Sequence, residues 1–258
     1  MITEPLFFLC AIAAVLIAGI GKGGFGGGTV VVAVPLLSLV VPPVQAAAIM
    51  LPILCLMDLL SLWAYRGVYD RRNLKVLLPS GLIGVGLGSL SFNVLDDVYI
   101  KLMVGFLAIL FSVNYWLMKF LPHSQATCSG SLLYGGFWGA LSGFTSFSVH
   151  AGGPPLNIYL LPQKLHKTVF LGTIVIFFAV VNYVKLVPYA WLGLLDTSNL
   201  LTSLSLVLLA PLGVYLGMRL HRRLDETWFY LCCYVLLLLT GGQLCYEGVV
   251  ELLDRTSG

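Results

Sequence analysis

Four long stretches of this chain contain no charged side chain. They span residues 23–57, 120–163, 197–218 and 227–246. Each is at least as long as a bilayer-crossing helix, which needs about 20 mostly apolar residues. Only 10% of the residues are charged, whereas a soluble domain carries roughly a quarter, so there are too few charges to cover a water-exposed surface. The sequence therefore predicts a membrane protein with one transmembrane domain, residues 1–258.

The apolar runs are continuous rather than alternating, which predicts helices and argues against the strands of a membrane barrel. The apolar count suits roughly seven or eight crossings. The runs with the length of a single crossing are 44–64, 74–94, 98–118, 168–189, 199–219 and 227–248. We therefore expect an all-α polytopic membrane protein.

Two further apolar runs, 6–41 and 131–162, are interrupted by helix-breaking residues. The first contains the glycine-rich segment 22–28, and the second contains the segment 142–155, which ends in Gly-Gly-Pro-Pro. Glycine clusters and Pro-Pro do not continue a helix at ordinary cost, so we expect the flanking helices to be shorter than a full span. Broken backbone at membrane depth survives only where protein buries it or water reaches it.

The two halves of the chain resemble each other. The matches are Gly19 with Gly139, Gly23 with Gly143, Gly67 with Gly193, Asp70 with Asp196, Gly84 with Gly213 and Gly88 with Gly217. Their order is kept, while the offset drifts from about 120 to about 129 residues. This pattern predicts a duplication, with a first repeat at 1–120 and a second at 130–258, in which the two breaks are equivalent elements.

The loop charges predict how the repeats are oriented. The loops 65–75, 163–167 and 219–226 are basic and are expected in the cytoplasm, whereas 95–97 and 190–198 are acidic. Equivalent loops thus carry opposite charge, which indicates inverted repeats. We expect each repeat to be a broken or re-entrant helical hairpin followed by three transmembrane helices, with both termini outside. Eight plain crossings in two parallel repeats remain the alternative.

Inverted repeats with broken helices at the membrane midplane mark the binding site of a secondary transporter, so we expect the site between the two glycine-rich breaks at the midplane. Each break frees backbone N–H groups at a helix start, which suits an anion. Lys22 lies far from the ends of its membrane run, where a lysine is costly unless it is hydrated or paired. The substrate-binding candidates are Lys22, Gly23, Gly24, Phe25, Gly26, Gly27, Gly28 and Thr29 at the first break, and Thr145, Ser146, Ser148, His150, Gly152 and Gly153 at the second.

Each polar candidate also has a plain structural interpretation. Lys22 could be an interfacial lysine that snorkels to the headgroups. The hydroxyls of Thr145, Ser146 and Ser148 could satisfy backbone groups of the break. His150 could bind an anion, carry a proton or only bond a carbonyl group.

Two polar residues within later spans are candidates for coupling. Asp58 lies inside the run 44–64, and Asn182 falls near the equivalent place of the second half. Asp58 could carry a coupling proton, while pairing with Arg66 or facing the headgroups is the alternative. Lys185 is close to the end of its apolar run, and we expect it to snorkel.

Several other functions lack support in the sequence. Residues 21–26 fit the GxGxxG pattern, but no strand precedes them, so we reject a dinucleotide site. The glycines of 81–88 predict close helix packing. The spans lack paired carboxylates, metal-ligand clusters and a nucleophile–base spacing, so we expect no enzyme, catalytic residue, cofactor or metal. No basic cluster sits on a soluble module, so nucleic acid is not an expected partner.

These features resemble the sulfite exporter TauE/SafE family over nearly the whole chain. The resembling residues are the glycine-rich break 21–28 leading into 34–37, the alanines 46–48, the segment 65–67 with Asp70 and Arg71, and the second glycine-rich break. The resemblance implies a multi-pass bacterial- or archaeal-type inner-membrane transporter that exports sulfite or organosulfonates such as sulfoacetate.

We therefore expect a secondary transporter that exports a small anion and is coupled to the proton gradient. The anion preference is argued from the breaks, while the sulfur-containing substrate class comes from the resemblance. The expected partners are the small anion and the lipid bilayer, and a homodimer is compatible with this interpretation. An anion channel that uses the same pore is the rival function.

Overall fold

The computed structural model describes residues 4–25, 28–92, 96–120, 131–220 and 226–257, and these ranges contain helices and no strand. The helices of the first half are α1 (Pro5–Gly24), η1 (Gly28–Val32), α2 (Ala33–Leu37), α3 (Pro43–Ala64), α4 (Arg71–Phe92) and α5 (Asp97–Phe120). Those of the second half are α6 (Leu132–Val149), α7 (Gly153–Leu160), η2 (Leu161–Gln163), α8 (Lys167–Trp191), α9 (Thr197–Val207), α10 (Leu209–Leu220) and α11 (Glu226–Ser257).

Within the described ranges, six helices are long and apolar enough to cross a bilayer: α1, α3, α4, α5, α8 and α11. The pair α9 and α10, bent by 45°, makes a seventh span if it is counted as one. The bend lies at Leu208, because Pro211 has no N–H to donate to the carbonyl four residues earlier. The expected all-α, multi-pass membrane fold is therefore confirmed, and the single-crossing runs are correct to within a few residues, except that α11 continues to Ser257.

The first interrupted run differs from expectation in one respect. We expected both helices that flank its break to be shorter than a span, yet α1 has 20 residues and continues through four glycines to Gly24. The physical reason is packing against α10. A Cβ added to Gly19 would lie 2.8 Å from Gly213 Cα, and one added to Gly23 would lie 2.2 Å from Val214 O. The glycines let two backbones touch, which offsets their low helix propensity.

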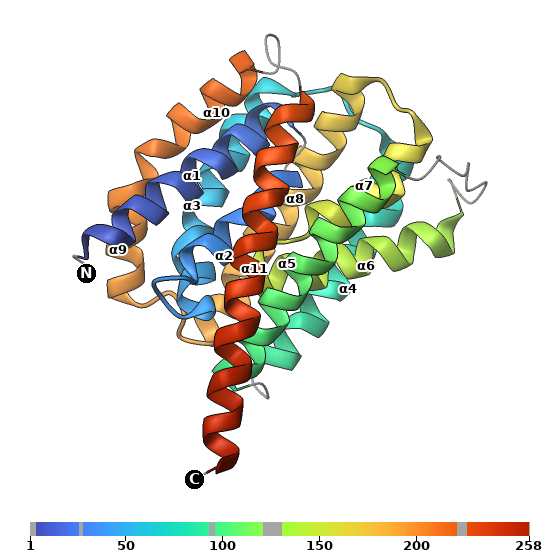
Figure 1. Ribbon diagram of the computed structural model, residues 1–258. Coiled ribbons are helices and arrows are strands. Elements are labelled where there is room, and N and C mark those ends of the chain that lie inside the picture. The colour runs from blue at the N-terminus through green and yellow to red at the C-terminus, as the bar shows by residue number, and fades with distance from the viewer. Residues whose placement is uncertain (1–3, 26–27, 93–95, 121–130, 221–225, 258) are drawn as a thin grey trace.

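The helices pair across the two halves of the chain (Figure 1). The first helix of each half packs along a helix of the other half: α1 along α10, and α6 along α4. The helices α5 and α11 pack along each other. A Cβ on Gly84 would lie 1.9 Å from Ala140 O, and one on Gly88 would lie 2.9 Å from Phe147 Cβ. The close helix packing predicted for 81–88 is therefore present at these two glycines.

The same turn follows α3 and α8. Gly67 and Gly193 both have positive φ, 83° and 70°, a conformation that glycine adopts at no steric cost. Three residues later, the Asp70 carboxylate accepts a hydrogen bond from Asn73 N at 2.7 Å, and the Asp196 carboxylate accepts one from Asn199 N at 2.6 Å. These caps start α4 and α9. The sequence match between the two halves thus corresponds to matching backbone geometry.

The two ends of the bundle differ in charge. The start of α4 and the 3-10 helix η2 meet at the end drawn uppermost in Figure 1, where Asn73 Nδ2 donates to Gln163 Oε1 at 2.9 Å. The charged side chains at this end are mostly basic: Arg66, Arg71, Arg72, Lys75, Lys164 and Lys167. Charges that the sequence places far apart therefore gather on one face.

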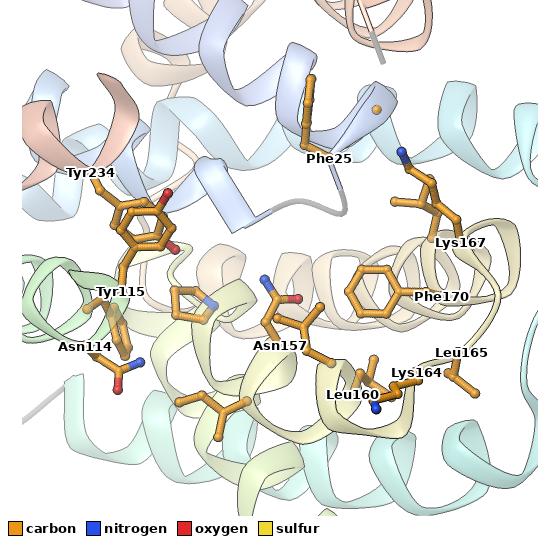
Figure 2. Close-up of a pocket in the computed structure, with 16 residues that line it drawn as sticks. Phe25, Asn114, Tyr115, Asn157, Leu160, Lys164, Leu165, Lys167, Phe170 and Tyr234 are labelled. Atoms are coloured by element: carbon orange, nitrogen blue, oxygen red, sulfur yellow. The ribbon is translucent and has the colours of Figure 1, made fainter. Parts of the chain in front are cut away.

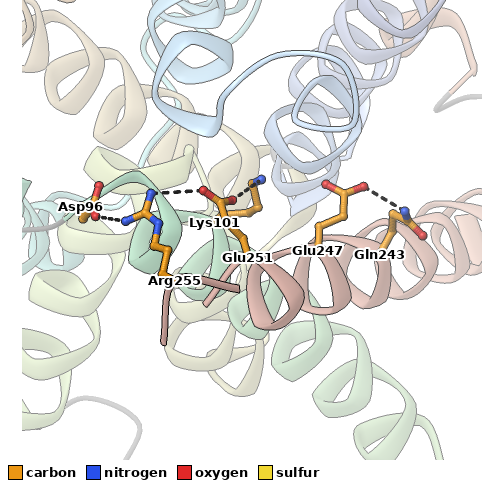
Figure 3. A network of polar contacts seen from close by, with 6 residues as sticks. All are labelled: Asp96, Lys101, Gln243, Glu247, Glu251 and Arg255. Atoms are coloured by element: carbon orange, nitrogen blue, oxygen red, sulfur yellow. Dashed lines mark hydrogen bonds and ion pairs between the residues drawn. The ribbon is translucent and has the colours of Figure 1, made fainter. Parts of the chain in front are cut away.

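The opposite end carries a network between α5 and α11 (Figure 3). Lys101 Nζ donates to Glu251 at 3.1 Å, and Arg255 forms ion pairs with both Asp96 and Glu251. Glu251 and Arg255 are four residues apart on the same helix, a spacing that favours such pairs. The network supports the 32-residue helix α11 beyond the apolar run that we expected to end at 248.

Candidate functional site

The breaks are shorter than the glycine-rich segments around them. Lys22, Gly23 and Gly24 belong to the last turn of α1, and the chain leaves the helix at Phe25. The candidates Gly26 and Gly27 lie outside the described residues, and Gly28 begins η1. In the second half, Thr145, Ser146 and Ser148 lie in the last turns of α6, and the break comprises His150 to Gly152.

At the end of α1, Lys22 forms an ion pair with Asp58 of α3. Both side chains are buried, with exposed fractions of 5% and 1%. The other carboxylate oxygen of Asp58 accepts a hydrogen bond from Asn182 Nδ2 of α8 at 2.6 Å. Three candidates from three helices thus form one cluster. Neither snorkelling of Lys22 nor pairing of Asp58 with Arg66 occurs in this structure.

At the second break, Lys185 of α8 is fully buried and donates three hydrogen bonds. Its Nζ lies 2.9 Å from Ser146 O, 3.1 Å from Ser146 Oγ and 2.8 Å from His150 Nδ1. The expectation that Lys185 snorkels is wrong, because its side chain lies on the face of α8 that packs against the second break. Sequence reasoning missed this residue. Its signal was the proximity of Lys185 to Asn182, one turn away on the same helix.

The contacts of His150 define its hydrogen-bonding state. Its backbone is left-handed, with φ 55°, which turns the chain out of α6. His150 Nε2 lies 2.9 Å from the carbonyl oxygen of Ala47, which can only accept, so Nε2 carries the hydrogen. His150 Nδ1 then accepts from the Lys185 ammonium. The imidazole is therefore neutral and hydrogen-bonded at both nitrogens. One of these bonds is to a carbonyl group, which was one of the three roles considered for His150.

The hydroxyl candidates differ from one another. Thr145 Oγ1 lies 2.9 Å from Leu141 O and 3.1 Å from Ala151 O, and Ser148 Oγ donates to Phe144 O at 3.1 Å. These two hydroxyls satisfy backbone carbonyls, as helical Ser and Thr commonly do. Ser146 Oγ instead accepts from Lys185. Thr29 Oγ1 is buried and has no hydrogen-bond partner among the described residues.

The helix start after the second break supplies fewer donors than we expected. After the first break, the chain starts the 3-10 helix η1 at Gly28 and continues directly into α2. The helix α7 begins with Gly153, Pro154 and Pro155, and proline has no N–H. The next N–H, of Leu156, donates to Gly152 O at 3.3 Å. At the second break, the prolines therefore leave few free N–H donors beside Lys185.

Residues beside both breaks line one small cavity of about 10 Å³, room for about one water molecule. Its lining residues are Lys22, Val30, Leu54, Ser146, His150, Phe178 and Asn182. Gly152 lies against this region, because a Cβ added to it would lie 2.6 Å from Ser142 O and 2.8 Å from the Phe178 ring. The two halves of the chain thus meet at a polar, closely packed point.

A larger vestibule of about 580 Å³ borders the same two breaks (Figure 2). Gly24 and Phe25 line it from the first break, and Pro154 lines it from the second. Lys164 and Lys167, from the basic end of the bundle, also line it. Of its lining residues, only Gly24 and Phe25 were candidates in the sequence, because the vestibule is assembled from separate segments that no local pattern connects.

A comparison with protein families identifies the chain. The family model described as "Sulfite exporter TauE/SafE" matches residues 11–244. The match covers most of the 258 residues, so the chain belongs to the TauE/SafE sulfite exporter family, whose members are membrane transporters. No curated protein and no solved structure matched the chain.

Proposed function

We propose that this TauE/SafE transporter exports sulfite or a small organosulfonate such as sulfoacetate across a bacterial inner membrane, and that the anion binds at the small cavity between the two breaks. The buried Lys22 carries this proposal. A lysine at this depth requires a partner, and Asp58 is its partner here. A sulfite or sulfonate oxygen offers the same charge-assisted hydrogen bond as the Asp58 carboxylate.

Symmetry in the contacts supports two structural repeats, and the loop charges favour their inversion. Tyr65 donates its hydroxyl to Gly23 O at 2.8 Å, and Tyr189 donates its own to Phe147 O at 2.7 Å. Both bonds tie the last turn of a hairpin helix to the helix that follows the hairpin, and the two tyrosines and the two acceptors are each 124 positions apart in sequence. The basic end, facing the cytoplasm, then places both termini outside.

The vestibule supports an entry route from the cytoplasm. Lys164 and Lys167 draw anions into it, and Phe25 also lines it, three residues after Lys22. The small cavity is too small for a sulfite ion, so side chains must move before the anion binds. This requirement favours a transporter over the rival anion channel, which needs a continuous open pore.

The Lys22–Asp58 pair supports coupling to the proton gradient. Protonation of Asp58 weakens its hold on Lys22, which is then available to the anion. When the anion leaves, the pair re-forms and the proton is released. A dianion that travels with one proton moves one net negative charge outward. A membrane potential that is negative inside favours this movement by about 2.3 kcal/mol per charge per 100 mV, whereas a pH gradient that is acidic outside opposes the outward proton.

Counterflow in proteoliposomes tests the proposal. Vesicles are loaded with unlabelled sulfite, labelled sulfite is added outside, and the membrane potential is clamped at zero with potassium and valinomycin. A transporter accumulates label transiently above equilibrium, whereas a channel only equilibrates it. Accumulation that depends on Lys22 supports the proposal, and simple equilibration would establish the channel instead.

Substitution of Asp58 tests the coupling separately. In the wild type, sulfoacetate binding should strengthen as the pH falls, because Asp58 must take up a proton. In Asp58→Asn, which imitates the protonated form, binding should lose this pH dependence. An unchanged pH profile in Asp58→Asn would assign the coupling proton to another group.

A further inference from the structure

We propose that Lys185 is the second cation of the anion site and that it makes the site select anions with two negative charges over anions with one. This inference rests on the proposed function, since it assumes that the anion binds at the small cavity. It concerns a residue outside the first break and a property, the charge of the substrate, that Lys22 alone does not explain.

The first argument is the missing countercharge. Lys185 has an exposed fraction of 0%, and its three hydrogen-bond acceptors are a carbonyl, a hydroxyl and a neutral imidazole nitrogen. Among the residues that the structure describes, it forms no salt bridge, whereas Lys22 has Asp58. A buried charge without a partner is costly. An anion bound nearby supplies the partner that the protein does not.

The second argument is the position of Lys185 relative to the cavity. Lys185 does not line the cavity itself, but Ser146 and His150 do, and both accept its hydrogen bonds. Because Ser146 Oγ accepts from the ammonium, the hydroxyl hydrogen of Ser146 points elsewhere and can be donated to an anion. Lys185 thus positions a donor at the cavity wall and places its charge one side chain behind it.

The third argument is the charge count with an anion bound. With both lysines protonated and Asp58 ionised, Lys22, Asp58 and Lys185 together carry one net positive charge, and protonation of Asp58 raises this to two. Lys22 is the only charged side chain that lines the cavity in the described ranges of the chain. A dianion such as sulfoacetate then gives a neutral site, whereas a monoanion such as methanesulfonate leaves one buried positive charge. In a poorly hydrated site, this difference favours the dianion.

Affinities for two anions of different charge test the inference. We would measure the dissociation constants of sulfoacetate and methanesulfonate by calorimetry on the purified, detergent-solubilised protein. The wild type should prefer sulfoacetate by at least about tenfold. Lys185→Met should weaken sulfoacetate binding by about 10- to 100-fold and methanesulfonate binding much less, which collapses the preference. Lys185→Arg, which keeps the charge, should retain the preference for sulfoacetate.

The other outcomes separate the two proposals. Equal loss of both affinities in Lys185→Met would assign Lys185 to packing and overturn the inference. Equal wild-type affinities for the two anions would overturn it without any variant, so it can be tested even if Lys185→Met fails to fold. If Lys22→Met changes neither affinity while both anions bind, the anion site lies elsewhere, and the proposed function fails on its own.

Discussion

Each break follows a long helix and is followed by a short one, but the positive charge beside the two breaks lies on different helices. At the first break, the cation is Lys22 on α1, and its partner on the next long helix is Asp58. At the second, α6 contributes Ser146, and the cation is Lys185 on α8. The first charge is compensated by an acid, and the second is not. One break is thus bordered by a closed ion pair, and the other by a buried lysine without an acidic partner among the described residues.

The largest expected effect is on stability, and it comes from removing Asp58, the countercharge of Lys22. Asp58→Leu should lower the free energy of unfolding by about 3–5 kcal/mol, because it leaves Lys22 buried without a countercharge. Lys185→Met removes a charge that has no acidic partner and should therefore destabilise far less. Unfolding in mixed detergent micelles measures both.

The double variant Lys22→Met/Asp58→Leu is the control for this prediction. It removes the whole pair and should recover most of the stability that Asp58→Leu loses. If Asp58→Leu and Lys185→Met destabilise equally, the contrast between a compensated and an open charge is wrong.

Binding should show the next largest effect. Lys22→Ala is expected to weaken sulfite binding by about 1–3 kcal/mol, the range for a hydrogen bond to a charged group. Calorimetry on the purified protein measures it. Lys101→Ala is the matched control, since Lys101 lies in the network at the other end of the bundle, bonded to Glu251. Unchanged affinity in Lys22→Ala would limit Lys22 to a structural role.

A methyl group added at the second break should lower the free energy of unfolding by no more than Lys22→Ala lowers that of binding. It should nevertheless clearly reduce transport. Gly152→Ala forces Ser142 O or the Phe178 ring to move, which costs about 1–3 kcal/mol of folding stability and should reduce counterflow at least about tenfold. Gly86→Ala is the control, because nothing lies within 4 Å of its added Cβ. Full transport by Gly152→Ala would show that this break tolerates bulk.

The smallest effects should come from the tyrosines that the two halves have in common. Tyr65→Phe and Tyr189→Phe each remove one hydrogen bond to a carbonyl at the end of a hairpin helix. Each should lower the unfolding free energy by about 0.5–1.5 kcal/mol, and the two losses should be similar. A large loss of stability at only one of the two positions would mean that the two halves are less alike in energy than the lengths of these hydrogen bonds suggest.

The sequence predicted the helices and the membrane because apolar runs and glycine clusters act locally. It also placed Asp58 and Asn182 at matching positions, and the structure brings them together. Lys185 was misjudged because its distance from the end of an apolar run does not reveal which face of the helix it occupies. The helix-start donors were overestimated because the prolines that break the second helix also remove its N–H groups. The vestibule depends on tertiary packing alone.

The glycine contacts between α1 and α10, and those between α4 and α6, have a mechanical consequence. At Gly19, Gly23, Gly84 and Gly143, backbone packs directly against backbone, so no long side chain lies between the helices there whose rotamers could absorb a change of angle. Each of these two helix pairs joins one half of the chain to the other, so the two halves are packed into each other. If these glycine contacts stay intact during transport, the two sequence halves cannot rock apart as separate bodies. Each moving unit must then contain helices from both halves: α1 moves together with α10, and α6 moves together with α4.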